Sequence, residues 1–299
     1  MSEDNKLFVL PFDHRGSFLE EMLGVSGDPS KEEIGRVKLY KQIIYSGFKV
    51  AMLSGLMPKN EAAILVDEEF GDSILIDAKK NGYKICVCVE KSGEQEFDFE
   101  YGDEFRNHIN KYRPEYVKVL IRYNPEGDQE MNKRQIEKLK MLCDFCYEEG
   151  YKIMLEPLVL PTERQLDMLN GDRDAYDQEM RPRLMELMIE ELQAGGVEPD
   201  IWKIEGLEEG EDYKMLVEQI RSQGRSSNII ILGRHASSSQ VERWLIAGRD
   251  IDGVIGFAIG RTIFWEPLEK YKNNEITSEE AIQKIAENYE HFYKVFQAK

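Results

Sequence analysis

The sequence predicts an α/β protein: a TIM (β/α)8 barrel that forms a single domain over residues 1–299. Short apolar runs rich in β-branched residues recur eight times, and each is followed by a longer stretch with helical periodicity. Strands that alternate with helices pair in parallel through right-handed crossovers. A chain of 299 residues has the usual length for eight such units in a closed barrel. A doubly wound open sheet is the alternative, but no GxGxxG motif follows the first strand.

The strands are predicted where short apolar runs stand between polar or glycine-containing segments. They are Lys6–Phe12, Ala63–Val66, Tyr83–Val89, Tyr116–Ile121, Lys152–Leu158, Ile201–Ile204, Asn228–Leu232 and Gly253–Ile255.

Helices are predicted between the strands from amphipathic periodicity and from start and stop signals. Examples are Ser30–Tyr45, Asn132–Glu149, Gln178–Ala194, Tyr213–Gln223 and Ser239–Ile246, and a C-terminal helix over Ser278–Phe296 closes the chain. Ser30 with Glu33, and Thr277 with Glu280, fit the capping box, in which a hydroxyl and a carboxylate satisfy free backbone N–H groups. Gly150 suits a left-handed helix end.

The longest irregular stretch is Thr162–Arg181, which contains four aspartates. Their spacing does not match a calcium-binding loop. We interpret the stretch as a solvated βα loop above the barrel mouth, with a lid as the alternative.

Composition limits the partners and the compartment. Asp and Glu number 57 against 39 Lys and Arg, a net charge of −18, which disfavours nucleic acid and membrane surfaces as partners. The apolar run Leu7–Phe12 is too short for a signal sequence or a membrane span, so we expect a cytoplasmic protein. The four cysteines fit no disulfide framework and are interpreted as buried apolar residues. The four histidines show no metal-ligand spacing, so no metal or other cofactor is predicted.

Functional side chains of a barrel stand at the carboxyl ends of its strands. Lys203 lies within the sixth strand, and period-2 alternation places Lys203 on the same face as Ile201 and Glu205. A lysine inside a barrel is desolvated, which lowers its pKa and frees the amine to attack a carbonyl. A structural ion pair with Glu156 or Glu205 is the alternative.

Lys118, on the fourth strand, competes for the same role. Two inward lysines are expected to lower each other's pKa by repulsion. Glu156 stands in an apolar strand, where a carboxylate is costly without a basic neighbour, and it could move protons as a general acid or base.

The last two strands end in glycine-containing segments, Gly233–Ser239 and Gly256–Phe264. Glycines followed by a helix start let backbone N–H groups approach an anion, and barrels commonly bind phosphate there. Arg261 would add a bidentate contact. Tight turns without a ligand are the alternative.

Together these segments resemble class I, Schiff-base aldolases of the tagatose-1,6-bisphosphate and sulfofructose-phosphate aldolase group. They are most similar to the aldolase-like domain fused to 5-dehydro-2-deoxygluconokinase in some bacteria, which is associated with myo-inositol catabolism. The kinase domain of those relatives has no counterpart here. The matching segments are Phe12–Ser17, Leu65–Gly71, Val117–Leu120, Leu155–Pro157, Ile201–Glu205 and Gly256–Thr262.

The resemblance implies a role for each matching residue. Lys203 would be the Schiff-base lysine, Glu156 the proton-transfer carboxylate, Lys118 an accessory lysine and Asp13 an acid that orients the substrate or lysine. Arg261 and the glycines would form the phosphate loop. The candidate substrate- and phosphate-binding residues are Arg15, Arg122, Gly233, Ser237, Gly260 and Arg261.

The predicted function is therefore metal-independent aldol cleavage of a phosphorylated keto sugar or keto-sugar acid. The favoured substrate is 5-dehydro-2-deoxygluconate 6-phosphate, which yields dihydroxyacetone phosphate and malonate semialdehyde. A tagatose-1,6-bisphosphate or sulfofructose-phosphate type aldolase is the enzymatic alternative. A non-catalytic sugar-phosphate-binding barrel is the alternative from another class. The expected partner is a small phosphorylated sugar, and a homo-oligomer is compatible with the sequence.

Overall fold

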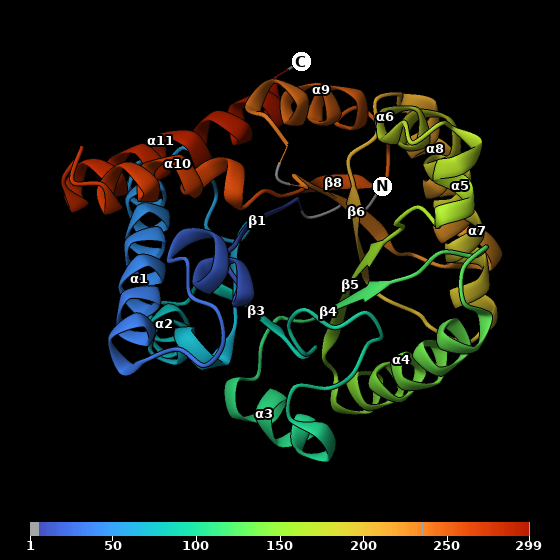
Figure 1. The fold of residues 1–299 in the computed structure, drawn as a ribbon, viewed down its shortest axis with the longest axis horizontal. Helices are drawn as coiled ribbons and strands as arrows, with labels where there is room; N and C mark the ends of the chain where they lie inside the picture. Colours follow the sequence, from blue (N-terminus) through green and yellow to red (C-terminus); the bar gives the residue numbers. More distant parts are fainter. Residues whose placement is uncertain (1–5, 235, 299) are drawn as a thin grey trace.

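The chain forms a closed barrel of eight parallel strands, and Figure 1 shows its helices as a ring around them. The computed structural model describes residues 6–234 and 236–298. The strands pair in sequence order, and β8 closes onto β1, which confirms the predicted TIM barrel. The strands are β1 (Leu7–Pro11), β2 (Ala62–Val66), β3 (Lys84–Cys88), β4 (Tyr116–Arg122), β5 (Lys152–Leu158), β6 (Ile201–Glu205), β7 (Asn228–Leu232) and β8 (Val254–Ala258).

The helices begin and end largely where their capping residues indicate. Both predicted capping boxes are formed, and Gly150 ends its helix with a φ of 77°. The helices are α1 (Lys31–Leu53), α2 (Glu68–Lys80), α3 (Phe105–Tyr112), α4 (Gln129–Glu149), α5 (Glu163–Met168), α6 (Arg173–Ala175), α7 (Arg181–Ala194), α8 (Gly210–Ile220), α9 (Ser238–Gly248), α10 (Arg261–Lys272) and α11 (Ser278–Gln297).

The apolar core has two parts, separated by the barrel wall. One cluster fills the barrel interior and includes Ile201, whereas a larger cluster between strands and helices contains Trp202 and Ile204. This is the alternation expected of a strand with side chains on both faces. It therefore directs Lys203, between those two outward residues, into the barrel.

Strand β8 is longer than its predicted range, which ended at Ile255. A Cβ atom on Gly256 would lie 1.9 Å from the carbonyl oxygen of Leu7. The glycine thus permits the close approach of β8 to β1 that closes the barrel, instead of ending the strand.

The stretch 162–181 also differs from the expected solvated loop. It contains α5, α6 and a π-helical turn over Tyr176–Met180, and the Tyr176 side chain is fully buried. The Tyr176 hydroxyl donates to the carbonyl oxygen of Val159 over 2.9 Å. The stretch is therefore anchored to the barrel, and the predicted helix Gln178–Ala194 begins at Arg181.

Two smaller predictions can also be compared with the structure. All four cysteines are buried and unpaired, as expected. Within the described ranges, each helix is too short or too polar to cross a bilayer.

Candidate active site

Two adjoining cavities open at the carboxyl ends of the strands. The Arg15 lobe has a volume of about 180 Å³ and is lined by the segments that follow β1 and β3, which include Arg15, and by residues of β4, which include Lys118. The Arg261 lobe has a volume of about 280 Å³ and lies at the ends of β7 and β8. The residues that line both lobes are His14, Leu120, Arg122, Glu156 and Lys203. Lys203 and Glu156 thus stand at the junction of the two lobes.

Glu156 joins the two inward lysines. Its Oε2 atom lies 2.7 Å from Nζ of Lys203 and 2.9 Å from Nζ of Lys118. The Lys118 ammonium also contacts Oδ2 of Asp13 at 2.9 Å and Oε1 of Glu90 at 2.6 Å. The lysine and glutamate side chains are each less than 10% exposed. The structure therefore brings together all four predicted catalytic residues.

The lysines of this cluster change the pKa values of its carboxyl groups. Burial would raise the pKa of the Glu156 carboxyl, but Lys118 and Lys203 outweigh burial and hold that pKa below its ordinary value. The same two lysines hold the pKa of Asp13 far below its usual range. For Glu90, burial prevails over Lys118 and raises the pKa.

The two lysines have different surroundings. Burial would lower the pKa of Lys118, but Asp13, Glu156 and Glu90 raise it well above its ordinary value. The expectation that neighbouring lysines lower each other's pKa is therefore wrong for Lys118, because three carboxylates surround its ammonium. In the described part of the chain, Lys203 has an ion pair with Glu156 alone. Lys203 thus has one carboxylate neighbour, whereas Lys118 has three.

The Arg261 lobe has the features predicted for an anion site. Arg261 is the first residue of α10, and the nearest carboxylate oxygen recorded for it, on Glu21, lies 3.6 Å away. A Cβ atom on Gly260 would lie 2.4 Å from the Pro11 carbonyl oxygen, so only glycine fits there. Gly233 also lines this lobe. A guanidinium group and a helix N-terminus thus face one cavity.

The cations of the Arg15 lobe are more fully occupied. Arg15 donates to Oε2 of Glu100 over 2.7 Å and to the Glu90 carbonyl oxygen over 2.5 Å. Arg122 donates to the Glu94 carbonyl oxygen. Both predicted binding residues line this lobe, and two nitrogens of Arg15 and one of Arg122 already have acceptors.

Ser237 does not join the other predicted binding residues. The loop after β7 turns so that the amide of Ala236 donates to the Gly233 carbonyl oxygen over 2.9 Å. Ser237 then caps α9 by accepting from the amide of Gln240, and it lines an outer groove instead of either lobe. His235, in the same loop, lies outside the described residues.

Two residues near the cavity were missed as candidates, His14 and Lys41. The ring of His14 lines both lobes, and burial, with help from nearby cations, lowers its pKa to about 3. Lys41 is fully buried in α1 and donates to the carbonyl oxygens of Phe12 and His14, on either side of Asp13. A signal for Lys41 exists, since it shares the apolar helix face of Val37, Ile44 and Phe48.

Potential metal ligands also occur in the Arg15 lobe. One ligand atom each of Asp13, Cys88 and Glu90 lies within 4.8 Å of the others. The Lys118 ammonium already contacts both carboxylates, and burial raises the pKa of the Cys88 thiol well above its ordinary value. A divalent cation at this place would therefore have to displace the ammonium and a thiol proton.

These features define a (β/α)8 barrel with a lysine–carboxylate cluster in a two-lobed cavity. The chain belongs to the family described as "Uncharacterized protein conserved in bacteria (DUF2090)", which matches residues 1–299. No curated protein shows significant similarity to it.

Solved structures share the fold. The fructose-bisphosphate aldolase of Plasmodium falciparum, in complex with TRAP and a small-molecule inhibitor, has a TM-score of 0.66 and 11% identity over 96% of this chain and 89% of its own. Cgl0159 of Corynebacterium glutamicum has a TM-score of 0.56 and 14% identity over 97% of this chain and 88% of its own. The YdjI aldolase of Escherichia coli K12 has a TM-score of 0.54 and 12% identity over 86% of this chain and 88% of its own. At such identities the likeness establishes the barrel fold.

Proposed function

We propose that this protein is a class I aldolase that cleaves a phosphorylated keto sugar or keto-sugar acid through a Schiff base on Lys203. The observation that carries the proposal is the contact between Lys203 and Glu156 at the junction of two cavities with cationic linings. An amine beside a carboxylate suits carbinolamine formation and dehydration. Two of the solved structures with the same fold are named aldolases.

The proposed reaction follows from this arrangement. The Lys203 amine adds to the substrate ketone, and loss of water gives an iminium. A carboxylate, with Glu156 the first candidate, takes the proton of the hydroxyl two carbons away, and the C–C bond breaks as its electrons move toward the iminium. The fragment that carried the hydroxyl leaves as an aldehyde, the remaining enamine is protonated on carbon, and hydrolysis releases dihydroxyacetone phosphate and the free amine. Lys118 keeps the carboxylates ionised.

The two lobes favour a keto-sugar acid over a sugar bisphosphate. Arg261 is only weakly paired and could bind a phosphate dianion, whereas Arg15 is already paired with Glu100. Asp13 and Glu90 line the Arg15 lobe as well, so a second dianion would meet repulsion there. A single carboxylate suits this lobe better. This reasoning supports 5-dehydro-2-deoxygluconate 6-phosphate, which would yield malonate semialdehyde as the second product.

Borohydride trapping tests the proposal. Wild-type protein incubated with dihydroxyacetone phosphate and borohydride should gain one reduced adduct, read by intact mass. Lys203→Met should abolish both the adduct and aldol cleavage, because the amine is lost while the stem volume is roughly kept. EDTA should leave the rate of aldol cleavage unchanged, because the iminium accepts the electrons that a metal ion would otherwise stabilise.

Lys118→Arg is the matched control, because it keeps a cation among the three carboxylates but cannot form a Schiff base. It should retain the adduct. An adduct that survives in Lys203→Met and disappears in Lys118→Arg would move the Schiff base to β4. A wild-type protein that binds dihydroxyacetone phosphate but forms no adduct would favour the non-catalytic sugar-phosphate-binding barrel.

A further inference from the structure

Arg234 has a backbone conformation that its residue type disfavours. It follows Gly233 at the end of β7 with a φ of 45°, in the left-handed region. Side chains with a Cβ atom are strained there, and the αL conformation is usually left to glycine or asparagine. Such strain persists where surrounding structure imposes it, often at a functional site.

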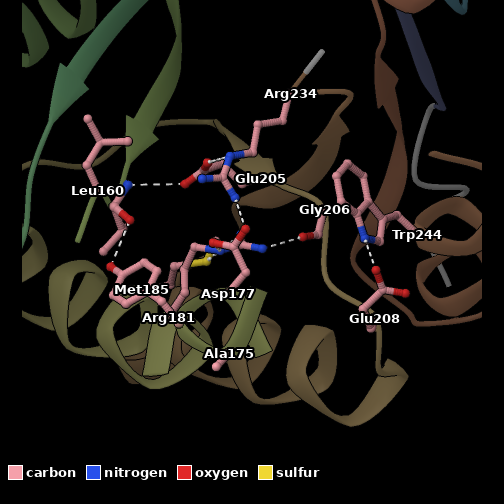
Figure 2. A network of polar contacts seen from close by, with 12 residues as sticks. Leu160, Ala175, Asp177, Arg181, Met185, Glu205, Gly206, Glu208, Arg234 and Trp244 are labelled. Atoms are coloured by element: carbon pink, nitrogen blue, oxygen red, sulfur yellow. Dashed lines mark hydrogen bonds and ion pairs between the residues drawn. The ribbon is translucent and has the colours of Figure 1, made fainter. Parts of the chain in front are cut away.

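Two carboxylates hold the Arg234 side chain (Figure 2). Its Nε atom lies 2.7 Å from Oε1 of Glu205, at the end of β6, and its Nη1 atom lies 2.5 Å from Oδ2 of Asp177. Asp177 also accepts from Nε of Arg181 over 3.0 Å, and Glu205 accepts from the amide of Val159 over 3.2 Å. Both carboxylates are thus themselves held in place.

Arg234 also lines the Arg261 lobe, together with Gly233, Gly260 and Thr262. Its Nη2 atom has no hydrogen bond or ion pair to any residue that the structure describes. Guanidinium groups bind phosphate through two nitrogens that point in the same direction. In Arg234 the Nη2 nitrogen remains available to donate to a ligand. The side chain is 27% exposed, so a ligand in the lobe can reach it.

We propose that Arg234 is a second phosphate-binding arginine, which Glu205 and Asp177 orient toward the lobe before substrate arrives. This inference rests on the proposed function, because it assigns a further ligand to the phosphate of the same substrate. The strained backbone places the guanidinium where both carboxylates reach it. Holding its side chain in advance reduces the entropy lost on binding.

The charge balance defines what Arg234 contributes. Two arginines and two carboxylates, Arg181 and Arg234 with Asp177 and Glu205, form a network with no net charge. Arg234 therefore adds directed hydrogen bonds, whereas Arg261 supplies the net positive charge. The predicted ligand is a phosphate monoester with oxygens facing both arginines. A carboxylate, with fewer oxygens, should depend less on Arg234.

Titration of the full-length protein with inorganic phosphate, followed by calorimetry, tests this role directly. Arg234→Gly should weaken phosphate binding by about 10-fold or more, the usual effect of losing a charge-assisted hydrogen bond. In borohydride trapping, the dihydroxyacetone phosphate concentration for half-maximal labelling should rise by a similar factor. The labelling rate at saturation should stay near the wild-type value, because Lys203 and Glu156 are unchanged.

Arg113→Gly is the matched control. Arg113 is an exposed arginine with a φ of 47° at the end of α3, and it lines neither lobe, because it precedes the amino end of β4. Its replacement relieves the same backbone strain and should leave phosphate binding unchanged. The double variant Glu205→Gln/Arg234→Gly avoids an unpaired buried carboxylate and should show the same loss of phosphate affinity while remaining folded.

Wild-type phosphate affinity in a folded Arg234→Gly protein would overturn the proposal and make Arg234 a structural link. A wild-type protein that binds no phosphate would also overturn it. Absence of a borohydride adduct, with phosphate binding that still depends on Arg234, would overturn only the aldolase mechanism.

Discussion

Two regions of this molecule bury lysines against carboxylates, and they differ in what the ammonium groups face. In the barrel, Lys118 and Lys203 share Glu156 and line a cavity. Behind β1, Lys41 pairs with Asp67 and donates to two carbonyl oxygens, at 2.7 and 2.9 Å. A lysine ammonium has three donors, and each of the three on Lys41 has an acceptor.

The difference separates a structural charge from a candidate reactive one. Lys41 is fully buried and its hydrogen bonds are complete, so it can fix the backbone around Asp13 but has no access to substrate. Lys203 is nearly as buried, yet it borders open volume on two sides. Burial of a charge is therefore weak evidence of catalysis unless a ligand can reach the group.

Removing the ammonium behind β1 should have the largest effect on stability. Lys41→Met leaves Asp67 as an uncompensated buried charge and should lower the free energy of unfolding by about 3–5 kcal/mol in urea titrations. Lys203→Met should lower the free energy of unfolding less, although this variant should lose aldol cleavage. Adding Asp67→Asn to Lys41→Met should recover part of the loss. Equal stability of Lys41→Met and wild type would mean that the pair is not buried in solution.

The next effect concerns proton transfer within the barrel cluster. Glu156→Gln keeps the shape of the side chain but removes the proton acceptor. It should still form the borohydride-trapped adduct yet cleave at least ~100-fold more slowly, the usual share of general acid–base catalysis. Glu90→Gln is the control, because Glu90 contacts Lys118 and not Lys203. Near-normal turnover of Glu156→Gln would make Glu156 a structural charge like Asp67.

A smaller effect is expected at the anion site. Arg261→Ala should raise the KM for a phosphorylated substrate by about 10- to 100-fold, because a charge-assisted hydrogen bond is lost. The kcat should change less. Arg225→Ala, which removes an arginine paired with Glu198 in the segment before β7, serves as the control. An unchanged KM and an unchanged phosphate affinity would place the anion elsewhere.

Much of the fold could be predicted because it depends on local patterns. The ranges of β5 and β7 match their predictions in full; Gly150 stands shortly before the first run, and Gly233 directly follows the second. The end of β8 was missed because a glycine such as Gly256 usually indicates the end of a strand. Here the glycine instead permits close contact with Leu7 of β1, almost 250 positions away. The pattern of inward side chains on β4, β5 and β6 was enough to place Lys118, Glu156 and Lys203.

The remainder of the site depends on long-range contacts. The Arg234 guanidinium contacts Glu205 and Asp177, two residues that no spacing rule connects with it. Lys41 acts on the loop after β1 from a helix on the outside of the barrel. Ser237 caps α9 and lines an outer groove instead of either lobe. Residues that reach a site through partners far along the chain are the ones that sequence reasoning missed.

His14 contacts both lysine regions, and its low pKa leads to a prediction about how stability depends on pH. Its carbonyl oxygen accepts from Lys41, while its ring lines both lobes. Burial is the main cause that lowers its pKa to about 3, with Arg261, Lys203 and Lys41 adding to it and Asp13 opposing. The folded protein therefore keeps His14 neutral at pH values where the unfolded chain binds a proton.

This difference fixes the sign of the pH effect. The unfolded state binds more protons below the ordinary histidine pKa of about 6.5, so folding stability falls as the pH drops from there toward 3. The contribution of one such group approaches ~1.4 kcal/mol per pH unit. His14→Gln removes it, so the loss of stability between pH 7.5 and 5 should be smaller in the variant by about 1–2 kcal/mol. Urea titrations of both proteins at the two pH values measure the difference. An identical pH dependence would contradict this prediction. It would show that the His14 ring titrates as an exposed histidine, unaffected by burial and by the nearby cations.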